Sequence, residues 1–147
     1  MKKYLVLCWL FVAPALGWAN ESADLSPAQL KQLLVEVNEL QNKVLLQNST
    51  IADLNKLFAR YTEDFEYIHE VYGGTYSRQH LYKNYAAHIK DGKYSRTDAR
   101  YKIVTMIVGL NAVAVERQEV HAGVTSHHLT VFEFRADKVS RIIEYWK

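Results

Sequence analysis

The residues best suited to do chemistry lie in one alternating stretch, residues 65–74, with the sequence FEYIHEVYGG. Successive side chains of an extended chain point to opposite faces, so Phe65, Tyr67 and His69 share a face. That face is aromatic and carries one titratable group. The imidazole of His69 can take up or release a proton near neutral pH. The Gly73-Gly74 pair predicts a turn where this strand ends.

Alternation in two later segments adds polar groups that could join this histidine. His128 shares a face with Thr130 and Phe132, and Glu144 shares one with Trp146. If these faces point inward, one pocket would contain His69, His128 and Glu144 together.

Arg117, which alternates with Val113 and Val115, would bring a cation to the same pocket. A carboxylate oriented on a histidine sets its tautomer and raises its basicity. The pair of His69 and Glu144 is therefore the preferred hypothesis for a catalytic site.

Each of these residues also has a structural interpretation. His69 could be a hydrogen-bonded core residue without a catalytic role, because buried polar groups are normally satisfied by neighbours. Glu144 and Arg117 could face solvent or form a structural ion pair. Tyr85 and Tyr82 have the spacing of residues that pack one face of a helix.

Other kinds of site are not predicted. His127 and His128 are adjacent in a strand and point apart, and no set of His, Cys, Asp and Glu has the spacing of metal ligands. No glycine-rich phosphate loop and no Gly-x-Ser-x-Gly elbow is present. We therefore expect no metal, no cofactor and no nucleotide.

The N-terminal segment has the three parts of a secretory signal peptide. Lys2 and Lys3 supply its positive charge, residues 4–16 are apolar, and small residues lie three and one before a break after Ala19. We expect residues 1–19 to be removed and the product to be periplasmic or secreted.

The exported product is expected to be one neutral domain, residues 20–147. The apolar run of the leader is too short to span a bilayer, and Cys8 lies within that run where a lipid-attachment signal is not expected. Two of the 18 basic residues, Lys2 and Lys3, leave with the leader, so the rest balance the 16 acidic residues. Without a basic stripe, nucleic acid is not expected as a partner, and no stable membrane anchor is expected.

Three helices and five strands are expected to position the candidate residues. Ser26 caps a first helix that runs to Val44, Thr50 caps a second with an acidic residue three positions later, and Ser77 caps a third at about residues 78–90.

Four strands follow at hairpin spacing, at residues 101–108, 112–120, 127–135 and 141–146, which predicts antiparallel pairing.

The late strands are apolar on both faces. Phe132 and Phe134 point one way, whereas Leu129 and Val131 point the other. Three helices can cover only one face of the sheet, so the other face would be an exposed apolar patch. We therefore expect a homodimer through the outer face of the sheet.

The order of these elements resembles the nuclear transport factor 2-like superfamily, in its SnoaL-like branch. The segment FARYTEDF at residues 58–65 and the ending EYW at residues 144–146 carry the resemblance, which covers about residues 27–147. It implies an α+β cone, with three helices packed in a curved antiparallel or mixed sheet. The superfamily contains ketosteroid isomerases, polyketide cyclases, dehydratases and members without chemistry.

The resemblance implies roles for individual residues. His69 stands at the strand position of a catalytic aspartate, so proton transfer stays possible but an aspartate mechanism is not supported. Tyr61 matches a tyrosine that lines the isomerase pocket. Thr130 stands where isomerases have an oxyanion-stabilising aspartic acid, and its hydroxyl is a weaker donor. The other predicted ligand-binding residues are Tyr67, Tyr85, Arg117, His128, Phe132 and Trp146.

The sequence therefore predicts an exported protein with a pocket for a small apolar molecule. The alternative is an isomerase, cyclase or dehydratase that transfers a proton on an apolar carbonyl compound, with His69 as acid and base.

Overall fold

A computed structural model describes residues 24–147 of the chain. The expected signal peptide, residues 1–19, lies outside the described residues. No helix within residues 24–147 has the length and apolar character needed to cross a membrane.

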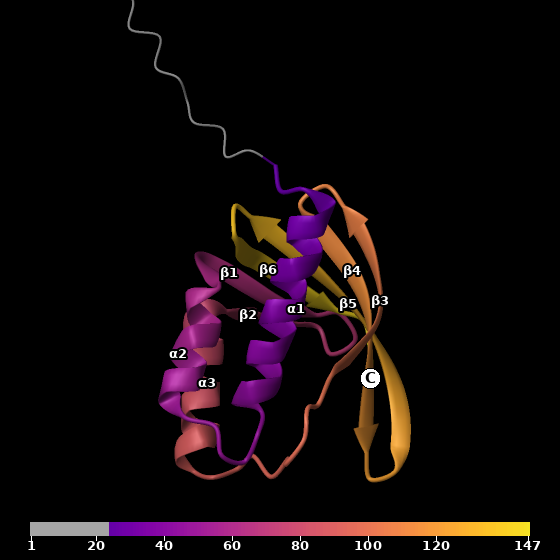
Figure 1. Cartoon of the computed structure of the whole chain (residues 1–147). Helices are drawn as coiled ribbons and strands as arrows, with labels where there is room; N and C mark the ends of the chain where they lie inside the picture. Colours follow the sequence, from indigo (N-terminus) through magenta and orange to yellow (C-terminus); the bar gives the residue numbers. More distant parts are fainter. Residues whose placement is uncertain (1–23) are drawn as a thin grey trace, which may run out of the picture.

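The helices lie in the first part of the chain, together with two strands, and the last part contains only strands (Figure 1). The three helices are the predicted ones, and a short strand that was not predicted, Gly74–Ser77, follows the first strand. In chain order the elements are α1 (Pro27–Val44), α2 (Ile51–Ala59), β1 (Tyr61–His69), β2 (Gly74–Ser77), α3 (Arg78–Lys90), β3 (Lys102–Gly109), β4 (Ala112–His121), β5 (Val124–Arg135) and β6 (Lys138–Glu144).

The helices begin where the sequence places their caps. The hydroxyls of Ser26, Thr50 and Ser77 each accept a hydrogen bond from the backbone N–H three residues later. The Asp53 carboxylate in turn accepts a hydrogen bond from the Thr50 backbone N–H and completes a capping box. These bonds use backbone donors that the first turn of a helix leaves unpaired.

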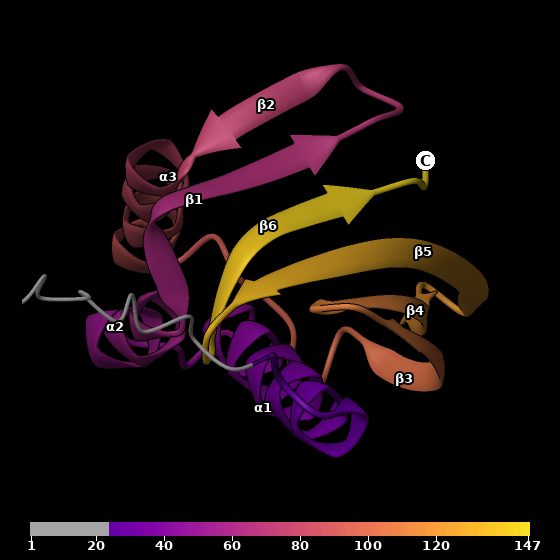
Figure 2. The same cartoon turned by 90° about the horizontal axis from the view of Figure 1, so that it is seen from above.

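The six strands form one mixed sheet in the order β2-β1-β6-β5-β4-β3. The late strands pair antiparallel as predicted, whereas β1 lies parallel to β6, from which it is far apart in the chain. The sheet curves, and the three helices lie within the curve (Figure 2). This arrangement confirms the predicted α+β class, with three helices packed in a curved antiparallel or mixed sheet.

Strand bounds differ from the prediction where turns intervene. β1 begins at Tyr61 rather than near Phe65, because Tyr61 already pairs with Val139 of β6 directly after α2. A register shift follows between Tyr61 and Glu66. Gly73 has a φ of 66°, which turns the chain, but Gly74 already pairs with His69 as the first residue of β2. β6 ends at Glu144, so Trp146 follows the strand instead of lying in it.

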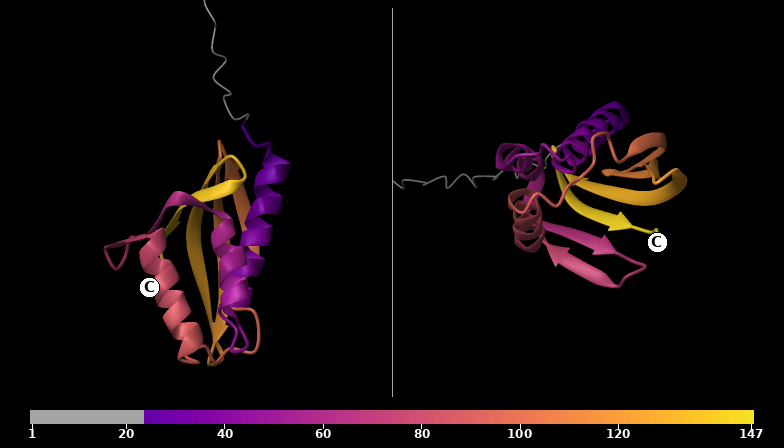
Figure 3. Two further views of the ribbon diagram at one scale, coloured as in Figure 1. Left: turned by 90° about the vertical axis from the view of Figure 1, so that its left-hand side faces the viewer. Right: turned by 90° about the horizontal axis from the view of Figure 1, so that it is seen from below.

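The core lies between the helices and the concave face of the sheet. The apolar stripe of α1 packs against β3 and β4, while α3 packs against β1 and β2. The loop from α3 to β3 passes the lower ends of the helices (Figures 1 and 3). Fully buried members include Leu34, Leu54, Phe65, Val113 and Phe132.

Candidate functional site

A partly enclosed cavity of about 320 Å³ lies between the helices and the β1–β6 part of the sheet. Five stretches of the chain form its wall. β1 contributes Tyr61, Phe65 and Tyr67; α3 contributes Leu81, Tyr85 and His88; the loop after α3 contributes Tyr94, Arg100 and Tyr101; β6 and the residues after it contribute Ile142, Glu144 and Trp146; the end of α1 contributes Gln41 and Leu45.

Strand pairing brings the polar candidates together on the inner face. His69 of β1 is opposite Glu144 of β6, and Thr130 of β5 is opposite Glu144 on the other side. On the neighbouring pair of strands, Arg117 of β4 is opposite His128 of β5. All five are buried, so the inward alternation expected from the sequence holds for each of them.

Arg117 and Glu144 form a buried ion pair at the base of this group. Arg117 Nη2 donates to Glu144 Oε1 at 2.7 Å and to Thr130 Oγ1 at 3.0 Å, and Nη1 donates to Gln41 Oε1 at 2.9 Å. The guanidinium carbon lies 4.0 Å from the centre of the Tyr101 ring. Desolvation of two charges costs free energy, which the hydrogen bonds and the stacking offset. The carboxylate on the cavity wall is therefore held in place and matched by a cation.

Tyrosine hydroxyls surround the carboxylate as neutral donors. Tyr67 Oη donates to Glu144 Oε2 at 2.6 Å. Burial, and then the negative charge of Glu144, raise the pKa of Tyr67. Burial likewise raises the pKa of Tyr61, Tyr85 and Tyr101. These phenols keep their protons at neutral pH. Tyr67 uses its one proton on Glu144, whereas Tyr61, Tyr85 and Tyr101 can donate hydrogen bonds to a ligand but cannot act as bases.

His69 is buried beside the cavity and does not line it. Its Nε2 lies 4.0 Å from Glu144 Oε2, which is beyond hydrogen-bond distance, and neither ring nitrogen has a hydrogen-bond partner. The ring packs against Tyr72 and Trp146 at centroid distances of 4.5 and 4.9 Å. Aromatic side chains therefore surround this histidine as expected, but they pack against its ring.

A second buried group forms around His128. Its ring stacks on Trp146 with centroids 4.1 Å apart, and its Nε2 lies 3.7 Å from Glu119 Oε2. Burial lowers the pKa of His128, although the charge of Glu119 acts in the opposite direction. Glu119 Oε1 also pairs with Arg96 and Arg100, at 3.2 and 2.9 Å. Trp146 therefore separates this ionic group from His69.

The predicted site residues divide into two layers. Tyr61, Tyr67, Tyr85, Glu144 and Trp146 line the cavity. The other five lie behind this wall: His69, Arg117, His128, Thr130 and Phe132.

The residues behind the cavity wall are covered because they pack within the sheet. Phe132 is fully buried under the Arg117 guanidinium, with 5.5 Å from its ring centre to the guanidinium carbon. Thr130 accepts a hydrogen bond from the same Arg117. These residues orient the ion pair. His69, His128 and Glu144 do not open together into one pocket, because only Glu144 reaches the cavity.

Several wall residues were not identified from the sequence. Leu81 and His88 lie four residues before and three residues after Tyr85 on α3, and this helical spacing could have found them. Tyr94, Arg100 and Tyr101 belong to a loop, which has no periodicity to reveal an inward side chain.

Within residues 24–147 the structure contains no group of three or more His, Cys, Asp or Glu side chains arranged to hold a metal ion. The polar groups of the cavity wall are one carboxylate (Glu144), one arginine (Arg100), one imidazole (His88), one amide (Gln41) and several phenols.

No family model and no curated protein matches this sequence. Solved structures do match it. An NTF2-like protein of unknown function from Pseudomonas aeruginosa aligns with a TM-score of 0.60 and 14% identity, over 81% of this chain and 98% of that one. A Kribbella flavida protein assigned only provisionally as a ketosteroid isomerase aligns with a TM-score of 0.60 and 13% identity, over 82% of this chain and 78% of that one. TerC crystallised with polyporic acid aligns with a TM-score of 0.56 and 15% identity, over 81% of this chain and 91% of that one.

Proposed function

We propose that this chain, which has the nuclear transport factor 2-like fold expected from its sequence, binds a small apolar molecule in the cavity beside β1 and β6. The observation that carries the proposal is the cavity, about 320 Å³ in volume and walled mainly by aromatic and aliphatic side chains with a few polar groups. Small-molecule sites have this composition, and the volume suits a small ligand. The neutral phenols favour a ligand with a hydroxyl or carbonyl oxygen that can accept a hydrogen bond.

An enzyme that transfers a proton on an apolar carbonyl compound is the second candidate. The two unpartnered ring nitrogens of His69 and their closeness to Glu144 favour it. A catalytic acid or base must reach the reacting atom within hydrogen-bond distance. His69 lies behind the cavity wall, and both oxygens of Glu144 already accept hydrogen bonds. The geometry therefore supports binding better than catalysis.

Native mass spectrometry of the protein from its own cells tests the proposal. We expect a chain that begins near Asn20, because residues 1–19 have the pattern of a cleaved leader and the product is proposed to be exported to the periplasm or beyond. We also expect an added mass from a retained small molecule. A protein that carries no added mass and takes up none from a library of apolar hydroxy and carbonyl compounds would contradict the binding function.

A variant that fills the cavity provides the control. Leu81→Trp places an indole in the cavity wall, so the occupied fraction should fall at least tenfold. Val35→Trp adds the same ring at an exposed position of α1 outside the cavity and should leave occupancy unchanged. Circular dichroism of both variants separates a blocked cavity from a lost fold.

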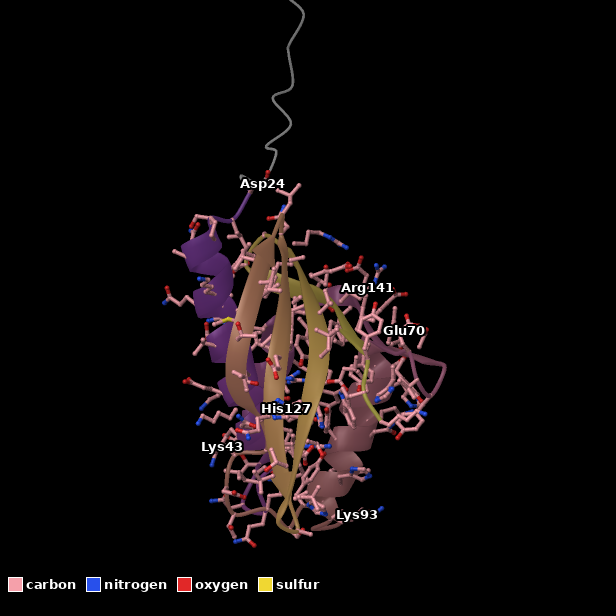
Figure 4. The ribbon with its side chains drawn as sticks, turned by 90° about the vertical axis from the view of Figure 1, so that its right-hand side faces the viewer. Asp24, Lys43, Glu70, Lys93, His127 and Arg141 are labelled. Carbon is pink, nitrogen blue, oxygen red and sulfur yellow. The ribbon has the colours of Figure 1, made fainter. Side chains whose placement is uncertain are left out.

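A homodimer through the outer face of the sheet is part of the proposal. Ile107 and Leu129 are 72% and 48% exposed and line one groove on the convex face, where His127 lies near the middle (Figure 4). Apolar side chains gathered in this way favour association. Leu129→Lys should convert a dimer to a monomer by light scattering, whereas Leu110→Lys, at an exposed turn residue, should not. A monomeric parent protein would refute the dimer.

A further inference from the structure

A second cavity, of about 290 Å³, lies at the end of the molecule where the loop after α3 crosses. Lys93 marks this end in Figure 4, opposite Asp24. The wall of the second cavity differs from that of the first because it is rich in basic side chains: Lys93, Arg96, Arg100 and His121. Glu119 is the one carboxylate in this wall.

The two cavities adjoin. Leu45, Tyr94 and Arg100 line both of them, so these side chains lie at the boundary between the two spaces. Leu45 is apolar, and the Arg100 guanidinium carbon lies 4.9 Å from the centre of the Tyr101 ring in the first cavity. A ligand longer than the first cavity would therefore reach the second cavity at this shared wall.

The charges of the second cavity favour an anion. Three cations face one carboxylate, and Glu119 is already engaged by Arg96 and Arg100. Lys93 also pairs with Asp91, but both side chains are more than half exposed. Asp91 therefore competes only weakly with an anion for the lysine. Asp98 is also largely exposed, 3.8 Å from Arg96. Among the residues of this wall, Tyr94 Oη and Arg96 Nε are buried donors without a hydrogen-bond partner.

We infer that the ligand of the first cavity is an anionic amphiphile, whose apolar body lies between the helices and the sheet and whose anionic group binds Lys93, Arg96 and Tyr94 in the second cavity. The inference rests on the proposed function and adds the class of ligand. An anion is not favoured in the first cavity, because Glu144 lies in that wall, and the terminal nitrogens of Arg117, which lies behind the wall, bond Glu144, Thr130 and Gln41. Unpartnered donors and an excess of cations are the groups that recognise an anion.

Calorimetric titration of the purified protein with octanoate and with octanamide tests the inference. The two probes share an alkyl chain and differ in the charge of the head group. Octanoate should bind at least tenfold more tightly at low salt, and the difference should shrink as salt rises, because partly exposed charges are screened.

Lys93→Gln should lower the affinity for octanoate about fivefold and leave the affinity for octanamide unchanged. Its side chain is 58% exposed, so the fold should tolerate the change. Lys31→Gln, an exposed lysine near the other end of α1, should affect neither probe.

Equal affinity for the two probes would overturn the anionic class and leave the binding function standing. Failure of both probes to bind would count against the binding function itself. Tighter binding of octanoate that Lys93→Gln does not weaken would overturn the assigned head-group site.

Discussion

Replacing Arg117 with methionine is expected to lower the free energy of unfolding by about 3–5 kcal/mol. Arg117 has no exposed surface, and its partner Glu144 is 4% exposed. The methionine keeps much of the buried volume but leaves the carboxylate without its cation in a desolvated place, which is the costly part of breaking a buried ion pair. Most single domains have only about 5–15 kcal/mol to lose, so the variant should be close to unfolding. Urea denaturation followed by circular dichroism measures the change.

Two controls decide whether the buried charge is the cause. Arg141→Met removes a surface arginine that pairs with Glu66 and Glu133 and is 42% exposed, so it should cost at most about 1 kcal/mol. The double variant Arg117→Met with Glu144→Gln removes both charges and should recover at least half of the loss. If Arg117→Met were no worse than Arg141→Met, the ion pair could not be the anchor of the cavity wall.

Replacing Phe58 with alanine is expected to cost about 3–5 kcal/mol and to weaken ligand binding as well. Phe58 of α2 is 2% exposed, and its ring packs edge-on against Tyr61, Tyr82 and Tyr85 at centroid distances of 5.2, 5.1 and 6.2 Å. It therefore joins α2, α3 and β1, and it supports two tyrosines of the cavity wall. Denaturation gives the stability, and calorimetry with octanamide under folding conditions gives the affinity.

Tyr72→Ala is the matched control for this aromatic group. Tyr72 is 67% exposed in the turn between β1 and β2, so its loss should change stability by about 0.5 kcal/mol or less and leave octanamide binding intact. A Phe58→Ala protein that loses stability but binds octanamide normally would show that Tyr61 and Tyr85 hold their positions without this ring.

Local patterns were enough to predict the helices and most strands. Ser26, Thr50 and Ser77 begin the three helices as expected, because a cap depends only on the few residues that follow it. Alternation, which is also local, placed Arg117 with Val113 and Val115 and placed Glu144 with Trp146, but left open whether these faces point inward, as the structure shows for Arg117 and Glu144.

The cavity wall could be predicted only in part. Tyr61 and Tyr85, predicted as ligand-binding residues, line the cavity, whereas His69 and Thr130 are inward but covered. Alternation gives the face of a strand and says nothing of which inward side chain is left uncovered. That depends on where α3 and the loop with Tyr94 pack over the sheet.

The sequence by itself determined the kinds of element, their order and the faces on which the polar groups lie, since these depend on residues within one or two turns of each other. Only the tertiary structure decided that Tyr67 and Glu144, 77 residues apart, share a hydrogen bond, and that Arg117 and not His69 is the ion-pair partner of this carboxylate. The first outcome follows from the parallel pairing of β1 with β6, and the second from the neighbouring order β6-β5-β4, which places Arg117 two strands away from Glu144. Pairing across the sheet is a property of the whole packed chain, because each strand is held by neighbours that no local pattern specifies.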